Sequence, residues 1–154
     1  LCYRKGDEFI DNPVNYEGID LNEFPVPDRG DIIVDASNSE FDATKRVFHI
    51  STSRGCPYHC TYCVNCKNNY WLARSELNVL EELNREFRRK GYKYINFVDC
   101  NFYVNPSRAE SLIARIRKEY PGVKFSFQTR SDQFANNKGQ LEKLLSAGDC
   151  SITL

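Results

Sequence analysis

The sequence predicts an α/β fold in which strands and helices alternate and the strands form a parallel sheet. From residue 47 onward, short apolar runs rich in β-branched and aromatic residues alternate with amphipathic stretches that begin at capping residues. Alternation at this spacing implies right-handed crossovers between parallel strands. The composition agrees, because 154 residues that are 41% apolar and 13% aromatic are enough for one domain with its own core.

The first strand is expected at Val47–Ile50 and the first helix from about Ser75 to Lys90. Ser75 is a suitable N-cap, and Gly91 is a suitable stop. The expected buried stripe of this helix consists of Leu77, Val79, Leu80, Leu83 and Phe87. Its expected solvent face carries two charge pairs spaced four residues apart, Glu81 with Arg85 and Glu86 with Lys90.

The rest of the chain continues the alternation. Asn105 and Pro106 predict the start of the second helix, because Asn caps well and Pro at the first helical position has no amide hydrogen to leave unpaired. Pro121 and Gly122 predict its end. Further strands are expected at Lys93–Val98, Val123–Thr129 and Cys150–Leu154, and a further helix from about Lys138 to Ala147. The chain would then hold about three and a half strand-helix units.

Residues 1–42 are expected to be a connector, and residues 43–154 a domain. The connector is rich in Asp, Asn, Pro and Gly, which interrupt any regular period. Two short strands around a turn at residues 5–7 are expected near its start. An extended stretch should follow, with Leu21, Phe24 and Val26 in surface grooves. Ending within the fourth strand would leave an unpaired sheet edge, so the chain is expected to be part of a longer protein.

Charge and hydropathy exclude several classes of protein. Lys plus Arg and Asp plus Glu both number 21, so the balanced charge gives no indication of a nucleic-acid partner. No apolar run is long enough for a membrane span, and no signal peptide is visible. We therefore expect a cytoplasmic protein.

The most informative stretch runs from Ser51 to Cys66. Four of the seven cysteines lie there, a crowding that favours a metal site over disulfides. Cys56, Cys60 and Cys63 are spaced so that one loop can present three thiolates to a cubic 4Fe-4S cluster, which leaves the fourth iron open for a ligand. Cys66 keeps an alternative open, a closed four-cysteine iron-sulfur or zinc module.

Residues 55–63, Gly-Cys-Pro-Tyr-His-Cys-Thr-Tyr-Cys, resemble the signature of radical S-adenosylmethionine (SAM) enzymes. The resemblance implies a partial (β/α) barrel, related to the TIM barrel, and an open iron chelated by SAM. It also implies that Tyr62 lies against the adenine. An electron from a reductant such as flavodoxin or ferredoxin would cleave SAM to a 5′-deoxyadenosyl radical, which abstracts hydrogen from a small organic substrate.

In such a barrel, further site residues are expected at the carboxyl ends of the strands. Asp99 and Asn101 follow the second strand, and Asp99 is a candidate contact for the cofactor's amino group or for the substrate. A capping carboxylate for the loop is the alternative for Asp99. Gln128 and Arg130 follow the third strand. Arg130 is a candidate partner for the SAM carboxylate or an acidic substrate, with an ion pair to Asp132 or Asp99 as the alternative.

Two other features resemble cobalamin-binding radical SAM enzymes. One is the hairpin followed by a linker in which Leu21 precedes Phe24-Pro25-Val26-Pro27, and the other is the stretch Asp99-Cys100-Asn101-Phe102. They imply a cobalamin domain upstream and a radical methyltransferase, or a related rearrangement or cyclisation enzyme. A radical SAM enzyme without cobalamin, such as a methylthiotransferase-like protein, is the alternative. A fragment that folds without reacting is another.

Arg74, Tyr70 and Trp71 are expected to serve structure. Arg74 precedes the first helix and is expected to tie the cysteine loop to it. Tyr70 and Trp71 are expected to pack beneath the loop, with a wall of the substrate site as the alternative.

Overall fold

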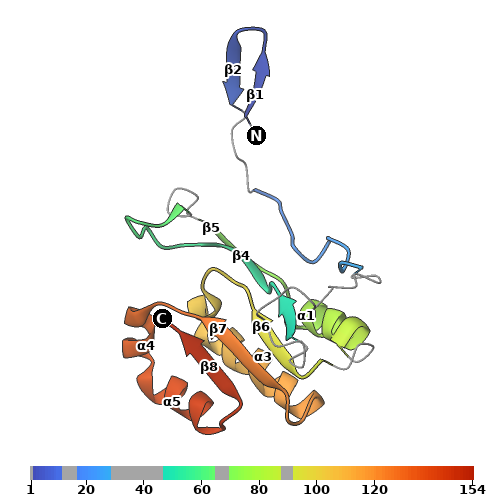
Figure 1. The fold of residues 1–154 in the computed structure, drawn as a ribbon, viewed down its shortest axis with the longest axis vertical. Helices are drawn as coiled ribbons and strands as arrows, with labels where there is room; N and C mark the ends of the chain where they lie inside the picture. Colours follow the sequence, from blue (N-terminus) through green and yellow to red (C-terminus); the bar gives the residue numbers. More distant parts are fainter. Residues whose placement is uncertain (1, 12–16, 29–46, 65–69, 88–91) are drawn as a thin grey trace, which may run out of the picture.

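The computed structural model describes residues 2–11, 17–28, 47–64, 70–87 and 92–154. At its centre is a four-stranded sheet, shown in the lower half of Figure 1, in which all neighbouring strands are parallel. The strands in spatial order are β3 (Val47–Ile50), β6 (Tyr94–Phe97), β7 (Lys124–Gln128) and β8 (Cys150–Thr153). Spatial order follows chain order, so the predicted α/β fold with a parallel sheet is confirmed.

The strands are nearly level with one another. Val47 lies opposite Tyr94, and Tyr94 lies opposite Lys124. Their carboxyl ends therefore meet at one edge of the sheet, where the residues that follow each strand are brought together.

Helices fill the crossovers between the strands. They are α1 (Glu76–Glu82), the π-helix η3 (Leu83–Phe87), the 3₁₀-helix η4 (Phe102–Val104), α3 (Pro106–Glu119), α4 (Ser131–Asn136) and α5 (Lys138–Ser146). The predicted N-caps are confirmed, because the side chains of Ser75 and Asn105 accept hydrogen bonds from the backbone amides of Asn78 and Arg108. The short elements η4 and α4 were not predicted from the sequence.

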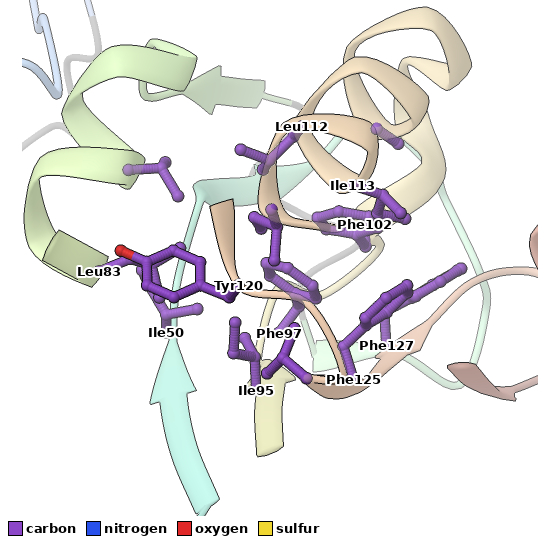
Figure 2. Close-up of a cluster of buried hydrophobic side chains, with 14 of the residues drawn as sticks. Ile50, Leu83, Ile95, Phe97, Phe102, Leu112, Ile113, Tyr120, Phe125 and Phe127 are labelled. Carbon is purple, nitrogen blue, oxygen red and sulfur yellow. The ribbon is translucent and has the colours of Figure 1, made fainter. Parts of the chain in front are cut away.

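The core lies between the sheet and its helices. Alternate strand residues are buried against helix α3 and its neighbours (Figure 2), among them Ile50, Ile95, Phe97, Phe125 and Phe127. Phe48 on β3 is buried as well, with its ring against Phe87. The ring of Phe97 stacks on Phe102 with the centroids 4.4 Å apart, which joins η4 to the sheet. The intervening strand positions carry polar side chains: Asn96 contacts His49 and accepts a hydrogen bond from Ser126.

The first helix differs from the prediction in its surface. Leu77 is 70% exposed, so its assignment to the buried stripe was wrong. An α-helix turns by roughly 100° per residue, so Leu77 points in nearly the opposite direction to the buried Val79, two residues further on. Glu86 is buried at 2% exposure, which contradicts its assignment to the solvent face. It follows the buried Val79 by about two helical turns, so it lies on the same face of the helix. The pair of Glu81 with Arg85 is confirmed, whereas Lys90 and Gly91 lie outside the described residues.

The N-terminal hairpin is confirmed. Strands β1 (Cys2–Lys5) and β2 (Glu8–Asp11) pair in antiparallel fashion around a turn in which Gly6 has a φ of +64°. Figure 1 shows the hairpin at the top, away from the sheet.

The linker that follows contacts the domain. The side chain of Asn22 accepts a hydrogen bond of 2.7 Å from the amide of Ser75. Leu21 and Phe24 line a cavity of about 360 Å³ with Ser51 and other residues, as expected, and Val26 is half-buried but does not line that cavity.

Within the described residues, none of the helices has the length and apolar character needed to cross a membrane.

Candidate functional site

The cysteine loop, residues 56–63, leaves the sheet at the carboxyl end of β3 through an antiparallel hairpin. Strand β4 (Ser53–Cys56) pairs with β5 (Tyr70–Ala73), and Cys56 lies opposite Tyr70. This hairpin was not predicted from the sequence, in which Tyr70 and Trp71 were expected to pack beneath the loop or to form a wall of the substrate site. The strand formers in residues 70–72 were the signal that could have found it.

A buried carboxylate holds the base of this hairpin. Asp99 follows β6, is 2% exposed, and accepts hydrogen bonds from the amide and hydroxyl of Thr52 and from the hydroxyl of Ser53. The structure therefore shows Asp99 in the capping arrangement. Arg108 supports the same junction by donating to the carbonyls of Thr52 at 3.0 Å and Arg74 at 2.8 Å.

Arg74 ties the hairpin base to α1, as expected. Its guanidinium donates to the carbonyl of Ser51 at 2.9 Å and forms an ion pair with the buried Glu82 at 2.6 Å. The residues immediately before the cysteine loop are thus anchored to two helices.

The carboxyl edge of the sheet and the cysteine loop enclose an open cavity of about 920 Å³. Three strand ends contribute to its lining, as the barrel argument predicts. Among the residues singled out from the sequence, Cys56, Cys60, Cys63, Tyr62, Asp99, Gln128 and Arg130 line it. Tyr62 is 91% exposed at its rim. Cys100, to which no role was assigned, also lines this cavity.

Asn101 does not line this cavity. It is buried, its side-chain oxygen accepts the amide of Tyr103, and its side-chain nitrogen donates to Gln133 at 2.8 Å. Its amide is therefore used to shape the loop after β6. Its predicted contact with a cofactor stays a prediction that this position does not favour.

Arg130 crosses the cavity to the cysteine loop. Its Nη1 lies 2.6 Å from Sγ of Cys60, and its Nε and Nη2 donate to the carboxylate of Asp132 at 2.9 Å and 2.8 Å. These hydrogen bonds raise the pKa of Arg130 and hold the pKa of Asp132 below its ordinary range. The ion pair with Asp132 that the sequence left as an alternative is present.

Gln133 on α4 connects the loop to the buried polar network, a role that was not predicted from the sequence. Its Nε2 donates to the hydroxyl of Tyr58 at 2.8 Å and to the carbonyl of Tyr103 at 3.0 Å. Burial raises the pKa of Tyr58 above its ordinary value. The signal was weak, because a single Gln within a short helix that was itself not predicted belongs to no motif.

Three cysteine thiols are the donor set that a cubic iron-sulfur cluster with one open iron requires. Within the described ranges, no three His, Cys, Asp or Glu side chains are grouped to hold one metal ion. In a cubic cluster each thiolate binds a different iron, so three thiols around one open cavity fit its needs. Cys66, the fourth ligand of the closed alternative, lies outside the described residues.

Comparison with protein families matches residues 50–154 to the family described as the Radical SAM superfamily. A curated relative, "Uncharacterized methyltransferase PH0819" of Pyrococcus horikoshii, is 28% identical over 153 residues. That alignment covers 97% of this chain and 32% of the relative, so the chain spans about a third of the relative's length.

Two solved structures of TsrM from Kitasatospora setae, a radical S-adenosylmethionine methyltransferase, have a similar fold. One contains cobalamin and a 4Fe-4S cluster, and the other contains tryptophan and a SAM analogue. Both give a TM-score of 0.51 at 21% identity. They cover 69% and 70% of this chain and 20% and 21% of TsrM.

Proposed function

This chain belongs to the Radical SAM superfamily, and from that premise we propose that Cys56, Cys60 and Cys63 bind a 4Fe-4S cluster that activates SAM. The observation that carries the proposal is geometric. The three thiols line one cavity together with the residues that follow β6 and β7. Chemistry at the carboxyl ends of the strands is what this type of barrel uses.

Some residues of this chain hold the cysteine loop in place, and others are proposed to orient the cofactor. Asp99 fixes the Thr52–Ser53 junction, so the cysteine loop starts from a rigid base. Tyr62 at the rim is proposed to lie against the adenine, and Gln128 to contact the cofactor. When bound, the cluster and SAM would supply a 5′-deoxyadenosyl radical for hydrogen abstraction, and the protein would exclude water and stray hydrogen donors.

Anaerobic reconstitution of the purified protein with iron and sulfide tests the cluster. We expect an electron paramagnetic resonance signal of the reduced cluster that changes when SAM is added. Cys60→Ala should abolish cluster binding, and Cys66→Ala, the matched control, should retain it. The closed four-cysteine module would be established instead if Cys66→Ala loses the cluster and SAM leaves the signal of the wild-type cluster unchanged.

We propose further that the reaction is a methyl transfer that uses cobalamin. The name of the curated relative supports a methyltransferase, and its alignment includes the hairpin and the linker. The linker sequence Phe24-Pro25-Val26-Pro27 supports a cobalamin domain joined through residues 1–42, with residues 43–154 as part of the catalytic domain. The proposed substrate is a small organic molecule, and the proposed electron donor is a flavodoxin or ferredoxin.

Labelled SAM tests the methyl transfer. The full-length protein, with the proposed cobalamin domain, should contain cobalamin when it is purified from cells supplied with that cofactor. It should transfer the labelled methyl group of SAM to the cobalamin and leave S-adenosylhomocysteine. Cobalamin-free protein should not. Formation of 5′-deoxyadenosine with no dependence on cobalamin would favour a radical SAM enzyme without that cofactor.

A further inference from the structure

Arg130 is held against Cys60 by three separate contacts. Its Nη1 lies 2.6 Å from Sγ of Cys60, the carboxylate of Asp132 accepts from its Nε and Nη2, and its guanidinium lies 4.3 Å from the centroid of the Tyr58 ring. Because Nε and Nη2 both bind the Asp132 carboxylate, the guanidinium is fixed with Nη1 directed at the Cys60 sulfur. The donor is therefore orientated by protein groups alone.

A second hydrogen bond connects the segment that carries Arg130 to the cysteine loop. Arg130 is the residue before α4, and Gln133 on that helix donates to the hydroxyl of Tyr58 at 2.8 Å. Tyr58 lies between Cys56 and Cys60 in the cysteine loop. The first residues of α4 and the residue before it therefore contact the cysteine loop at two points, the Tyr58 hydroxyl and the Cys60 sulfur.

Three of the five N–H groups of Arg130 already have partners. Nε and Nη2 donate to Asp132, and Nη1 donates to Cys60. The pair of parallel donors formed by Nε and Nη2 is therefore occupied by the Asp132 carboxylate. The third donor, on Nη1, has the sulfur of Cys60 as its partner.

We propose that Arg130 donates a hydrogen bond to the cluster-ligating sulfur of Cys60 and thereby raises the reduction potential of the cluster. This inference rests on the proposed function, because it requires the cluster to bind at the three cysteines. Adding one electron makes the cluster more negative, and a cationic donor at a ligand sulfur stabilises the more negative state. Hydrogen bonds to the sulfurs and net charge are among the factors that set such potentials.

The test is a redox titration of the reconstituted protein, followed by electron paramagnetic resonance. Arg130→Met removes the donor and the charge. At a fixed solution potential, the ratio of reduced to oxidised cluster should fall about tenfold, which is about 59 mV for one electron. The double variant Arg130→Met with Asp132→Asn removes the hydrogen bond to Cys60 but leaves the net charge unchanged. A ratio that still falls in this variant assigns the effect to the hydrogen bond.

Arg115→Met is the matched control. Arg115 forms an exposed ion pair with Glu76 on α1, so the same charge is removed away from the cavity and the potential should not change. Iron content is measured first: a wild-type protein without a cluster overturns the proposed function itself. A wild-type cluster whose potential is unchanged in both Arg130 variants overturns this inference alone. If Arg130→Met binds too little iron to titrate, the double variant decides the matter.

Discussion

Nη1 of Arg74 lies 2.6 Å from Oε2 of Glu82, and the Glu82 side chain is only 1% exposed. The same Arg74 nitrogen also donates to the carbonyl of Ser51 at the end of β3. This buried pair therefore connects helix α1 to the strand from which the cysteine loop departs.

We expect Glu82→Ala to lower the free energy of unfolding by about 3 kcal/mol, because it leaves the Arg74 guanidinium without its charged partner in a largely buried position. Chemical denaturation measures the change. Glu81→Ala is the matched control: Glu81 is the adjacent residue and pairs with Arg85 in solvent. It should cost no more than about 0.5 kcal/mol. Equal losses in the two variants would show that the buried pair does not stabilise the fold.

Asp99→Asn tests the second anchor of the hairpin base. The carboxylate accepts three donors, from the amide and hydroxyl of Thr52 and the hydroxyl of Ser53, and an amide cannot accept all of them. The loss should be about 1–3 kcal/mol of unfolding free energy, together with less iron bound per chain after reconstitution.

Asp7→Asn is a suitable comparison, since Asp7 forms an exposed pair with Arg4 in the N-terminal hairpin. Its effect should be within about 0.5 kcal/mol, with iron content unchanged. If Asp99→Asn is as stable as wild type and binds as much iron, the carboxylate does not support the loop.

Cys150 provides a test of burial at the start of β8. Burial, with Asp149 nearby, raises the pKa of this thiol to about 12. Since the thiolate is the species that reacts with iodoacetamide, alkylation of the folded protein at pH 8 should be at least about a hundredfold slower than in urea. The exposed Cys2 should react at similar rates in both, and peptide mass spectrometry follows each residue. Similar rates at Cys150 in both states would contradict its burial.

Local patterns in the sequence were sufficient for the sheet and most helices. Caps such as Ser75 and Asn105 act within one turn, and apolar runs such as Val47–Ile50 are continuous in sequence. The β4–β5 hairpin was missed because its pairing joins Gly55 to Trp71 across the cysteine loop, which no local pattern reports. The burial of Glu86 was missed for another reason: its spacing from Val79 follows the helical period, but a charged residue was assigned to the solvent face.

For the site, the rule that strand ends converge was enough to bring Asp99, Gln128 and Arg130 to one cavity with the cysteines. Their roles stay predictions. The rule does not say which way each side chain turns: Asn101 is turned into the core by its hydrogen bond to the Tyr103 amide. The direction of such a side chain depends on its hydrogen-bond partners in the folded protein, which the sequence alone does not identify.

Gly55 directly precedes Cys56, and its backbone conformation and close neighbours leave no room for a side chain. Its φ is +79°, and an added Cβ would clash with the carbonyl oxygen of Tyr70 and lie 2.7 Å from an atom of the Tyr70 ring. Gly55→Ala must therefore distort the β4–β5 pair, at a cost of about 3 kcal/mol in unfolding free energy.

Gly122→Ala is the matched control for this variant. Gly122 has a φ of +82°, but an added Cβ there meets nothing within 4 Å, so only the backbone strain of about 1–2 kcal/mol applies. Thermal unfolding compares the two variants, and reconstitution compares their iron content. Because Cys56 is displaced with the hairpin, Gly55→Ala should bind less iron and Gly122→Ala as much as wild type. Full iron binding by Gly55→Ala would mean that the cysteine loop does not depend on the hairpin that presents it.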